Sequence, residues 1–233
     1  METSSLTRIF LLCVLVIIAA FLFWRYIWFF RNPDRTVAQG ENIVSPADGT
    51  VVYVKKVQPN EEVIVIKQGV TARVKDIVRQ DMEAPKLVVG IFMSPFNVHY
   101  NRAPIAGRVE QIVHHPPKTT NLHMGPMHLR TLLNRLPLYE NSLHILENER
   151  TVTRISGRFK GDEMSCYVVQ IAGKNVNGID SYIPEGGDVR KGEIFGMIRI
   201  GSQVDIVVPK FDDMQVKVRP GDRVRAGESV LVE

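Results

Sequence analysis

The feature that most constrains this chain is an apolar stretch close to its N-terminus. Residues Ile9 to Trp24 contain no charged side chain, and after Arg25 the apolar character resumes through Phe30. As a helix, residues 9–30 would reach roughly 33 Å, enough to cross a bilayer core of about 30 Å. We therefore predict one N-terminal membrane helix, with an anchor at 1–35 and one further domain at 36–233.

The charges that flank this stretch predict its orientation. Arg25, Arg31 and Arg35 follow or end the apolar run, whereas Arg8 alone precedes it. The positive-inside rule then places the protein in the cell membrane, with the large C-terminal part on the cytoplasmic side. A cleaved signal peptide is the alternative, but no small-residue cleavage site precedes the aromatic cluster at 21–30.

After the predicted anchor, the residue pattern of the sequence is that of a β protein. Short apolar and β-branched runs are separated by Gly, Pro and Asn, and residues His128–Leu138 form the best candidate for a short helix. The predicted strands are Thr50–Val57, Glu62–Lys67, Ala72–Ile77, Leu87–Phe92, Arg108–Val113, Met164–Ile171, Ile194–Ile200, Val204–Val208, Met214–Val218 and Ser229–Val232. The expected fold is mainly β: a compact β-sandwich or barrel-sandwich-like domain.

Two internal repeats support this expectation. Residues 187–193 and 221–228 share a Gly-Asp-Val-Arg-Gly-Glu pattern with one insertion, and residues 46–51 and 104–109 share Pro-x-x-Gly-x-Val. Each is a turn with glycine followed by a strand, as in the flattened hairpins of lipoyl-like carrier domains. A carrier lysine is missing, since Met214 is followed by Gln215.

The charge and the cysteines exclude some partners. The net charge of +4 comes from scattered basic residues, which argues against a nucleic-acid partner. A mild positive excess beside a membrane anchor favours an anionic lipid surface instead. The two cysteines, Cys13 and Cys166, do not form a disulfide framework.

Four segments contain residues suited to covalent chemistry. Gly201-Ser202 joins two apolar runs, Asp48 lies in a Pro/Gly turn, His99 lies in a loop after a strand, and residues 147–150 form a charge cluster. An aspartate, a histidine and a serine are the types that activate a hydroxyl. Each segment also has a plain structural interpretation: a tight turn, an Asx-turn, a structural histidine and a solvated turn.

These segments, in this order, resemble the phosphatidylserine decarboxylases, most closely the short archaeal and bacterial type that includes archaetidylserine decarboxylases. The resemblance covers nearly the whole chain. The motifs are Phe29–Arg35, Ser45–Gly49, Phe92–Pro104, Glu147–Arg150, Val169–Gly173 and Phe195–Ser202.

The resemblance implies a proenzyme that cleaves itself between Gly201 and Ser202 into a β chain, 1–201, and an α chain, 202–233. The Ser202 hydroxyl would attack the Gly201 carbonyl, and β-elimination and hydrolysis would leave a pyruvoyl group at position 202. That covalent cofactor would form a Schiff base with a serine phospholipid and release CO2, giving the ethanolamine lipid. The implied partners are this lipid, the membrane and the two cleaved chains, and a homo-oligomer stays open.

The resemblance also implies roles for single residues. Ser202 is the pyruvoyl precursor, Asp48 the orienting carboxylate and His99 the base or proton donor. Arg102 stands where longer bacterial members have a second histidine, so the group that activates Ser202 stays open. A basic pair usual after Gly173 is replaced by uncharged residues 175–178, so phosphate binding would depend on Arg102, Lys118 or Arg150.

The histidine-rich stretch at 114–128 is predicted to form a flap over the substrate and not a metal site, because its ligand spacing is untypical of one. The alternative interpretation of the whole chain is a membrane-anchored adaptor or carrier without catalysis, which would stay uncut.

Overall fold

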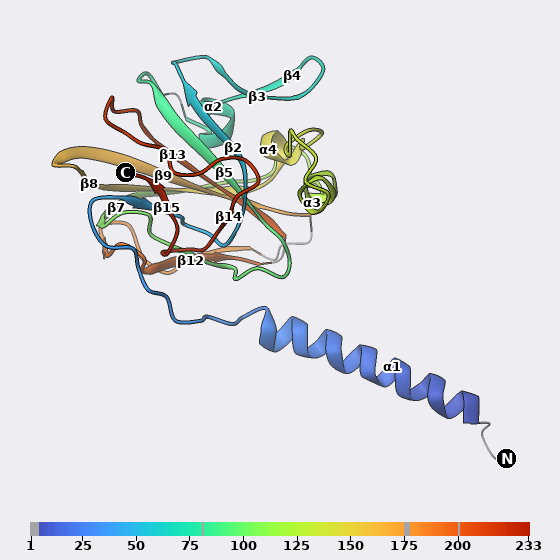
Figure 1. The fold of residues 1–233 in the computed structure, drawn as a ribbon. Helices are drawn as coiled ribbons and strands as arrows, with labels where there is room; N and C mark the ends of the chain where they lie inside the picture. The colour runs from blue at the N-terminus through green and yellow to red at the C-terminus, as the bar shows by residue number, and fades with distance from the viewer. Residues whose placement is uncertain (1–4, 81, 175–177, 200) are drawn as a thin grey trace. The chain divides into compact units, whose positions relative to one another are not determined.

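The computed structural model describes residues 5–80, 82–174, 178–199 and 201–233. It divides into two compact units, Met1–Pro33 and Asp34–Glu233. In the first unit, helix α1 (Ser5–Phe23) continues into a π-helical turn, η1 (Trp24–Trp28), as Figure 1 shows. Residues Ser5–Trp28 are long and apolar enough to cross a membrane.

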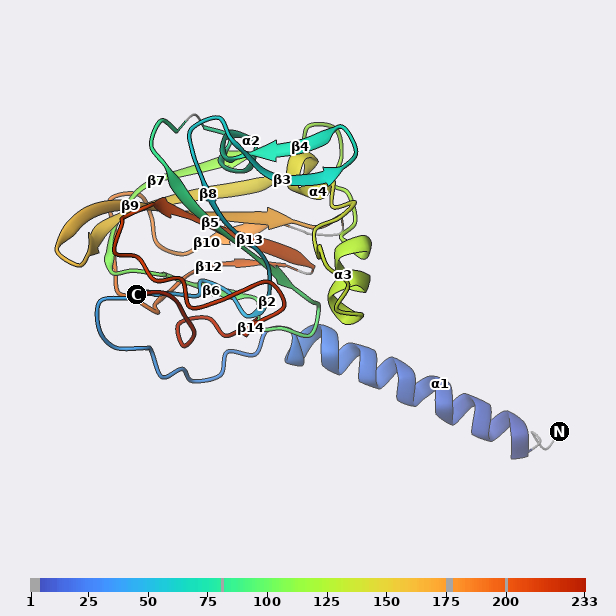
Figure 2. The same ribbon diagram turned by 45° about the horizontal axis from the view of Figure 1, so that its top comes forward.

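The second unit is organised around one curled, antiparallel sheet (Figures 1 and 2). Its strands, in spatial order, are β11 (Asp188–Val189), β7 (Gly107–His115), β8 (Arg150–Phe159), β9 (Asp162–Ala172), β13 (Ser202–Pro209), β5 (Lys86–Met93), β2 (Gly49–Val57) and β14 (Arg223–Val224). The central strands β9, β13 and β5 are buried on both faces, which explains their nearly continuous apolar sequences.

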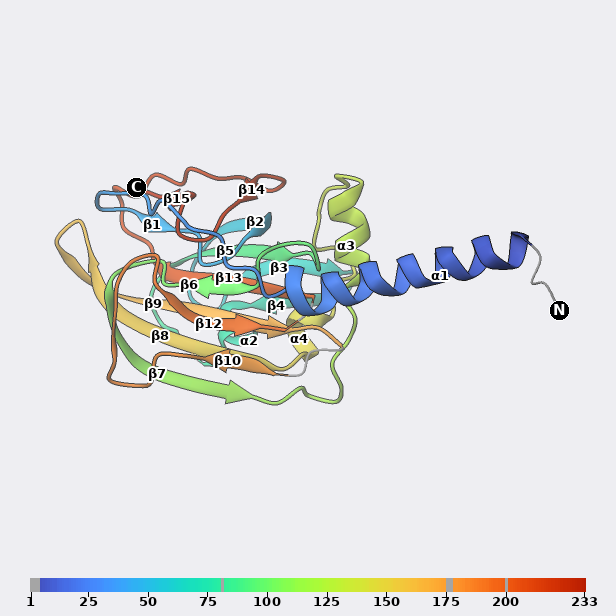
Figure 3. The same cartoon turned by 90° about the horizontal axis from the view of Figure 1, so that it is seen from below.

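Smaller elements cover the two faces of this sheet. One face is covered by the hairpin β3 (Glu62–Lys67) and β4 (Val70–Arg73), and by helices α2 (Val74–Val78), α3 (Gly125–Leu132) and α4 (His144–Glu147). The other is covered by a second sheet, β10 (Ile179–Ser181), β12 (Ile194–Ile198) and β6 (Tyr100–Arg102), and by the pair β1 (Ile43–Val44) and β15 (Val230–Val232). Figure 3 shows β6, β12 and β10 in front of the large sheet.

These layers enclose two hydrophobic cores. The first core lies between the large sheet and the small sheets, and includes Ile91, Val204 and Ile198. The second core lies under the hairpin and the helices, and includes Val169 and Val207. Because side chains alternate along a strand, consecutive residues of β13 enter different cores. The mainly β fold predicted from the sequence is confirmed.

The two internal repeats fold alike. β14 pairs with the start of β2, and β11 pairs with the start of β7. The amide of Val51 donates to the carbonyl of Asp222 at 2.9 Å, and the amide of Val109 donates to that of Gly187 at the same distance. The two repeats therefore form two similar pairs of strands, which we call clasps, and each clasp joins segments that lie far apart in the chain, so it is not a local hairpin.

Both clasps need a glycine, and they differ at the residue before it. A Cβ on Gly49 or on Gly107 would collide with a backbone carbonyl of the neighbouring strand. The residue before the glycine is Asp48 in one repeat and Ala106 in the other. Since the turn forms with alanine, the fold of the turn alone does not require an aspartate there.

Two predicted strands and the predicted helix are corrected. The run 72–77 was expected to be a strand, but β4 ends at Arg73 and α2 follows, because the Asp76 carboxylate accepts the Arg73 amide at 2.9 Å and caps a helix. In the run 214–218, Val216 forms only an isolated bridge to Val232.

The helix expected at 128–138 is α3, which begins at Gly125 and ends at Leu132. Pro126 occupies its first turn, where a missing N–H costs nothing, and Asn134 has a φ of 50°, which does not continue a helix. The strand expected at 194–200 is observed to Ile198, and Ile200 lies outside the described residues.

Candidate functional site

The Gly201-Ser202 junction lies where β13 begins. Gly201 has a φ of 60°, in the left-handed region that favours glycine, and a Cβ there would meet no atom within 4 Å. Ser202 is fully buried and pairs with Met93 of β5 on one side and with Ala172 of β9 on the other. The scissile position expected from the sequence thus joins an open, half-buried glycine to a serine fixed in the central sheet.

The Ser202 side chain connects several of the sequence motifs. Its hydroxyl donates to the sulfur of Met93 at 3.4 Å, and the same sulfur lies 3.7 Å from the Nδ2 of Asn101. The Oδ1 of Asn101 accepts a hydrogen bond from Gln170 at 2.8 Å. The next residue, Arg102, donates its amide to the Pro46 carbonyl at 2.9 Å. The segments that contain Asp48, His99 and Ser202 are therefore brought together.

His99 is completely buried on the segment that leads into β6. Its Nδ1 lies 2.9 Å from the carbonyl oxygen of Asn97, which can only accept, so Nδ1 carries the hydrogen. The neutral ring then has its lone pair on Nε2, the form that can take up a proton. The His99 carbonyl accepts the Ile198 amide at 3.4 Å, four residues before Ser202.

Asp48 lies at the start of β2 and is nearly buried. Its Oδ2 accepts a hydrogen bond from Arg35 at 2.8 Å, and its Oδ1 accepts the Ala226 amide at 2.8 Å. Arg35 also pairs with Glu228 at 3.1 Å. The carboxylate is thus firmly oriented, by an arginine and by the second repeat.

The expected phosphate ligands lie in different surroundings. Arg102 donates to the carbonyl of Gly192 at 2.9 Å, and burial, followed by the charge of Arg35, lowers its pKa. Lys118 is half-exposed, with its Nζ 3.9 Å from Glu147. Residues 175–177 lie outside the described part of the chain.

Arg150 is placed differently from the expectation. It is completely buried, and its guanidinium donates to the backbone carbonyls of Asn148, Asp76 and Ile77 at 3.0 to 3.1 Å. Burial, and then Arg79, lower its pKa to about 10. The cluster at 147–150 is therefore no solvated turn but an interior junction between α4 and β8, and this position does not support a phosphate contact from Arg150.

A buried polar network on the opposite face of β13 was not anticipated from the sequence. Gln203 is its centre: its Oε1 accepts from His144 at 3.0 Å, and its Nε2 donates to Tyr53 at 3.0 Å and to Asp205 at 2.7 Å. The Tyr53 hydroxyl donates to Asp205 at 2.8 Å. The sequence signal that could have predicted this network is the presence of two polar residues, Gln203 and Asp205, within an otherwise apolar strand.

Burial shifts the titration of this network. Desolvation lowers the pKa of His144 to about 4 and raises the pKa of Asp205 to about 6, and it also raises the pKa of Tyr53. At neutral pH, His144 is therefore neutral and donates from Nε2, while Asp205 is largely ionised and accepts two hydrogen bonds.

An apolar pocket of about 290 Å³ opens beside the junction. Its wall includes Gly201, Phe92 and Pro95, together with Met124, Leu129 and Leu132 from α3 and the residue before it. Figure 2 shows α3 at the end of the sheet where β12 ends. The segment 114–128, predicted to be a flap, extends β7 to His115, has no helix or strand over residues 116–124 and begins α3; Met124 and Met127 belong to the second core, and Met124 also lines the pocket.

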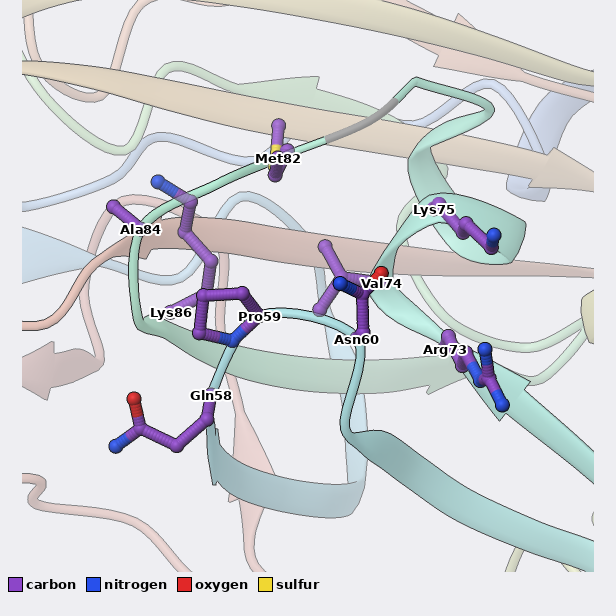
Figure 4. A pocket seen from close by; sticks show the side chains of 9 residues that line it. All are labelled: Gln58, Pro59, Asn60, Arg73, Val74, Lys75, Met82, Ala84 and Lys86. Atoms are coloured by element: carbon purple, nitrogen blue, oxygen red, sulfur yellow. The ribbon is translucent and has the colours of Figure 1, made fainter.

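A second cavity, between β4, α2 and the start of β5, encloses only about 20 Å³ (Figure 4). That space admits a water molecule but no lipid headgroup. Within the described residues, no group of three His, Cys, Asp or Glu side chains could hold a metal ion.

Fold and site together define a mainly β protein in which a left-handed glycine and a buried serine lie at the edge of an apolar pocket. A model of the phosphatidylserine decarboxylase family matches residues 22–232. The chain is 35% identical over 206 residues to an archaetidylserine decarboxylase proenzyme of Methanocaldococcus jannaschii, covering 88% of this chain and 87% of that protein.

Bacterial relatives are similarly close. The chain is 35% identical over 220 residues to a phosphatidylserine decarboxylase proenzyme of Syntrophotalea carbinolica, covering 94% and 83% of the two chains. A proenzyme of the same name from Nitrobacter winogradskyi is 34% identical over 206 residues, covering 88% and 68%. The chain belongs to the phosphatidylserine decarboxylase family and is a decarboxylase, so the non-catalytic adaptor is not favoured.

Proposed function

We propose that this decarboxylase cleaves itself between Gly201 and Ser202 and acts on a serine phospholipid, either phosphatidylserine or archaetidylserine. The observation that supports the proposal most is the junction itself, where a buried serine follows an unobstructed, left-handed glycine. His99 and Asp48 lie on segments that form hydrogen bonds close to this junction. The names of the relatives support both lipid classes and the proenzyme form.

In the first step, the Ser202 oxygen bonds to the Gly201 carbonyl carbon and the amide becomes an ester. His99 is the proposed base, since its Nε2 carries the lone pair. β-Elimination then releases Gly201 as a carboxylate and leaves dehydroalanine at position 202, and addition of water expels ammonia and leaves a pyruvoyl group. The soft contact to Met93 leaves the hydroxyl free to reach the carbonyl, because a thioether is a weak acceptor.

The pyruvoyl ketone supplies an electron sink for the carbon that loses CO2. The apolar pocket wall of Phe92 and Met124 would exclude water from this carbon. Asp48 is proposed to orient the neighbouring charged side chains through its ion pair with Arg35. Arg102 and Lys118 remain the proposed phosphate ligands, and His99 the proposed proton donor after CO2 has left.

The anchor explains how a lipid substrate is reached. Residues Ser5–Trp28 could hold the enzyme on the membrane, and the arginine excess after the apolar run supports a cytoplasmic decarboxylase domain.

Intact-mass spectrometry of the full chain beside Ser202→Ala tests the proposal. The wild type is expected to give two fragments, 1–201 and 202–233, the second starting with a ketone and resistant to Edman degradation. Ser202→Ala is expected to stay one chain and to release no CO2. Ser181→Ala, at an exposed serine of β10, is the matched control and is expected to be cut normally.

Vesicles that contain either a diacyl or an ether serine lipid then identify the substrate by CO2 release. An uncut, active wild type would overturn the self-cleavage mechanism. An uncut and inactive wild type would restore the adaptor interpretation.

A further inference from the structure

Helix α3, the turn after it and Phe96, which follows Pro95 of the pocket wall, expose several large apolar side chains. We call this set the leucine face: Phe96 (67% exposed), Leu129 (56%), Leu132 (74%), Leu133 (49%) and Leu136 (62%). A helix that covers a core normally presents polar residues to water on its outer side. The inner side of α3 already packs Met127 into the second core, so the leucine face is a second apolar side.

The leucine face continues into the pocket at the cleavage junction. Leu129 and Leu132 belong to both, and the pocket wall beyond them reaches Gly201. A molecule that covers the leucine face would therefore lie directly at the mouth of the site.

The segment that surrounds this face is cationic. From Gln111 to Tyr139 the sequence contains Lys118, Arg130 and Arg135 but no aspartate or glutamate. Arg130 pairs with Glu140 and Lys118 pairs with Glu147, both beyond the segment, whereas Arg135 is exposed. Exposed leucines with basic neighbours are the combination that binds the interface of an anionic bilayer.

We infer that the leucine face docks onto the lipid surface of the membrane and holds the pocket at Gly201 against the bilayer. The docking is argued from this surface, and its purpose rests on the proposed lipid substrate. A second copy of the chain fits less well, because the two cationic rims would meet across a two-fold axis. Helix α3 is also only about 12 Å long, too short for the roughly 1,200 Å² of a stable dimer.

A fluorescent label tests the docking directly. In the full chain with Cys13→Ser, Leu132→Cys is labelled with NBD and reconstituted into phosphatidylcholine–phosphatidylglycerol vesicles with brominated acyl chains; Cys166 is buried and does not react. The matched control is Glu163→Cys, exposed at the far end of β9 from Ala172, which pairs with Ser202. That distance is about 30 Å along the strand.

We expect the label at 132 to be blue-shifted and quenched by the brominated lipid, and the label at 163 to be neither. Equal quenching at the two positions would overturn the docking. So would a blue shift at 132 without bromine quenching, because a second copy or another protein would then cover the face. Repeating the measurement in Ser202→Ala separates this result from the proposed function, since docking does not require cleavage.

Activity provides the second readout. Leu133→Asn with Leu136→Asn removes two side chains of the face that do not line the pocket. The KM for vesicle lipid is expected to rise about tenfold, with kcat and the two fragments unchanged. Val65→Asn, at an exposed valine of β3, is expected to leave KM unchanged. An unchanged KM in the double variant would contradict the inference.

Discussion

The two faces of strand β13 hold their polar side chains in contrasting ways. On one face, Ser202 donates a single long bond to the thioether of Met93. On the other, Gln203 and Asp205 are joined to His144 and Tyr53 by hydrogen bonds of 2.7 to 3.0 Å. The backbone of Ser202 is fixed in the sheet but its hydroxyl has only a weak partner, whereas the side chains of Gln203 and Asp205 tie the other face of the strand to distant segments.

This division suits the cleavage that we propose at the start of the strand. In the cleaved enzyme that we propose, Gln203 and Asp205 belong to the α chain, whereas Tyr53 and His144 belong to the β chain. The network would then bridge the two chains within a few residues of the new N-terminus. The variants below test the comparison, in order of decreasing expected effect.

Gln203→Leu should destabilise the protein most. It removes three hydrogen bonds and leaves Tyr53, His144 and Asp205 buried without them, which costs about 4 kcal/mol. Denaturant unfolding in detergent, in a Ser202→Ala background that stays one chain, measures this loss. The matched control Gln68→Leu, at an exposed position, should change stability by about 0.5 kcal/mol or less. Equal, small effects of both variants would remove the contrast between the faces.

Asp205→Asn should change how stability depends on pH. The pKa of Asp205 is raised to about 6 from 3.8. Its contribution to the free energy of unfolding is therefore complete below pH 3.8 and is lost as pH rises through about 6. His144 has the opposite effect on stability. Because its pKa is lowered to about 4, its contribution to the free energy of unfolding is lost as pH falls through about 4.

His144 is common to both proteins, so its effect largely cancels in the comparison. The unfolding free energy of the variant relative to the wild type should therefore rise by about 3 kcal/mol between about pH 4 and pH 7. Unfolding midpoints across this range provide the measurement. A difference that does not vary with pH would show that Asp205 titrates as it does in water.

Gly201→Ala should have a smaller effect on stability, of about 1 kcal/mol. The cost is in the backbone, since φ is 60° while the space around the position is open. Fragment formation should slow, because the alanine is strained at this φ and its carbonyl is the one that Ser202 is proposed to attack. Gly161→Ala, at an open turn with φ of 87°, carries the same backbone penalty and should be cut at the normal rate. If both variants slowed equally, the effect would not belong to the junction.

Met93→Leu should have the smallest effect. The swap nearly conserves volume and should cost less than about 1.5 kcal/mol. Cleavage should continue, because the sulfur is a weak partner for the Ser202 hydroxyl, and Met164→Leu in the same core provides the comparison. Loss of cleavage in Met93→Leu alone would mean that the thioether positions the serine, and that the two faces are alike.

Local pattern predicted most of the fold. The strand at 62–67 is observed as expected, and those at 50–57, 87–92, 108–113 and 164–171 are observed one to three residues longer, because their composition favours a pleated, buried surface. The helix α2 was missed because Val74, Ile77 and Val78 suit a short strand as well as a helix. The strand β8 was not predicted at all, and the charged residues 147–150 at its start were interpreted as a solvated turn.

The amino-acid sequence alone was enough to predict an apolar N-terminal helix, a mainly β domain with two internal repeats, and the family motifs around Gly201-Ser202. Each depends on residues that are close in the chain, where periodicity and turn chemistry act. Only the tertiary structure decided that Arg150 is buried on backbone carbonyls about 73 residues away, and that Gln203 meets Tyr53 from 150 residues away. Alternation predicts that Ser202 and Gln203 point to opposite faces, but the partners on each face come from distant segments, and packing alone brings them together.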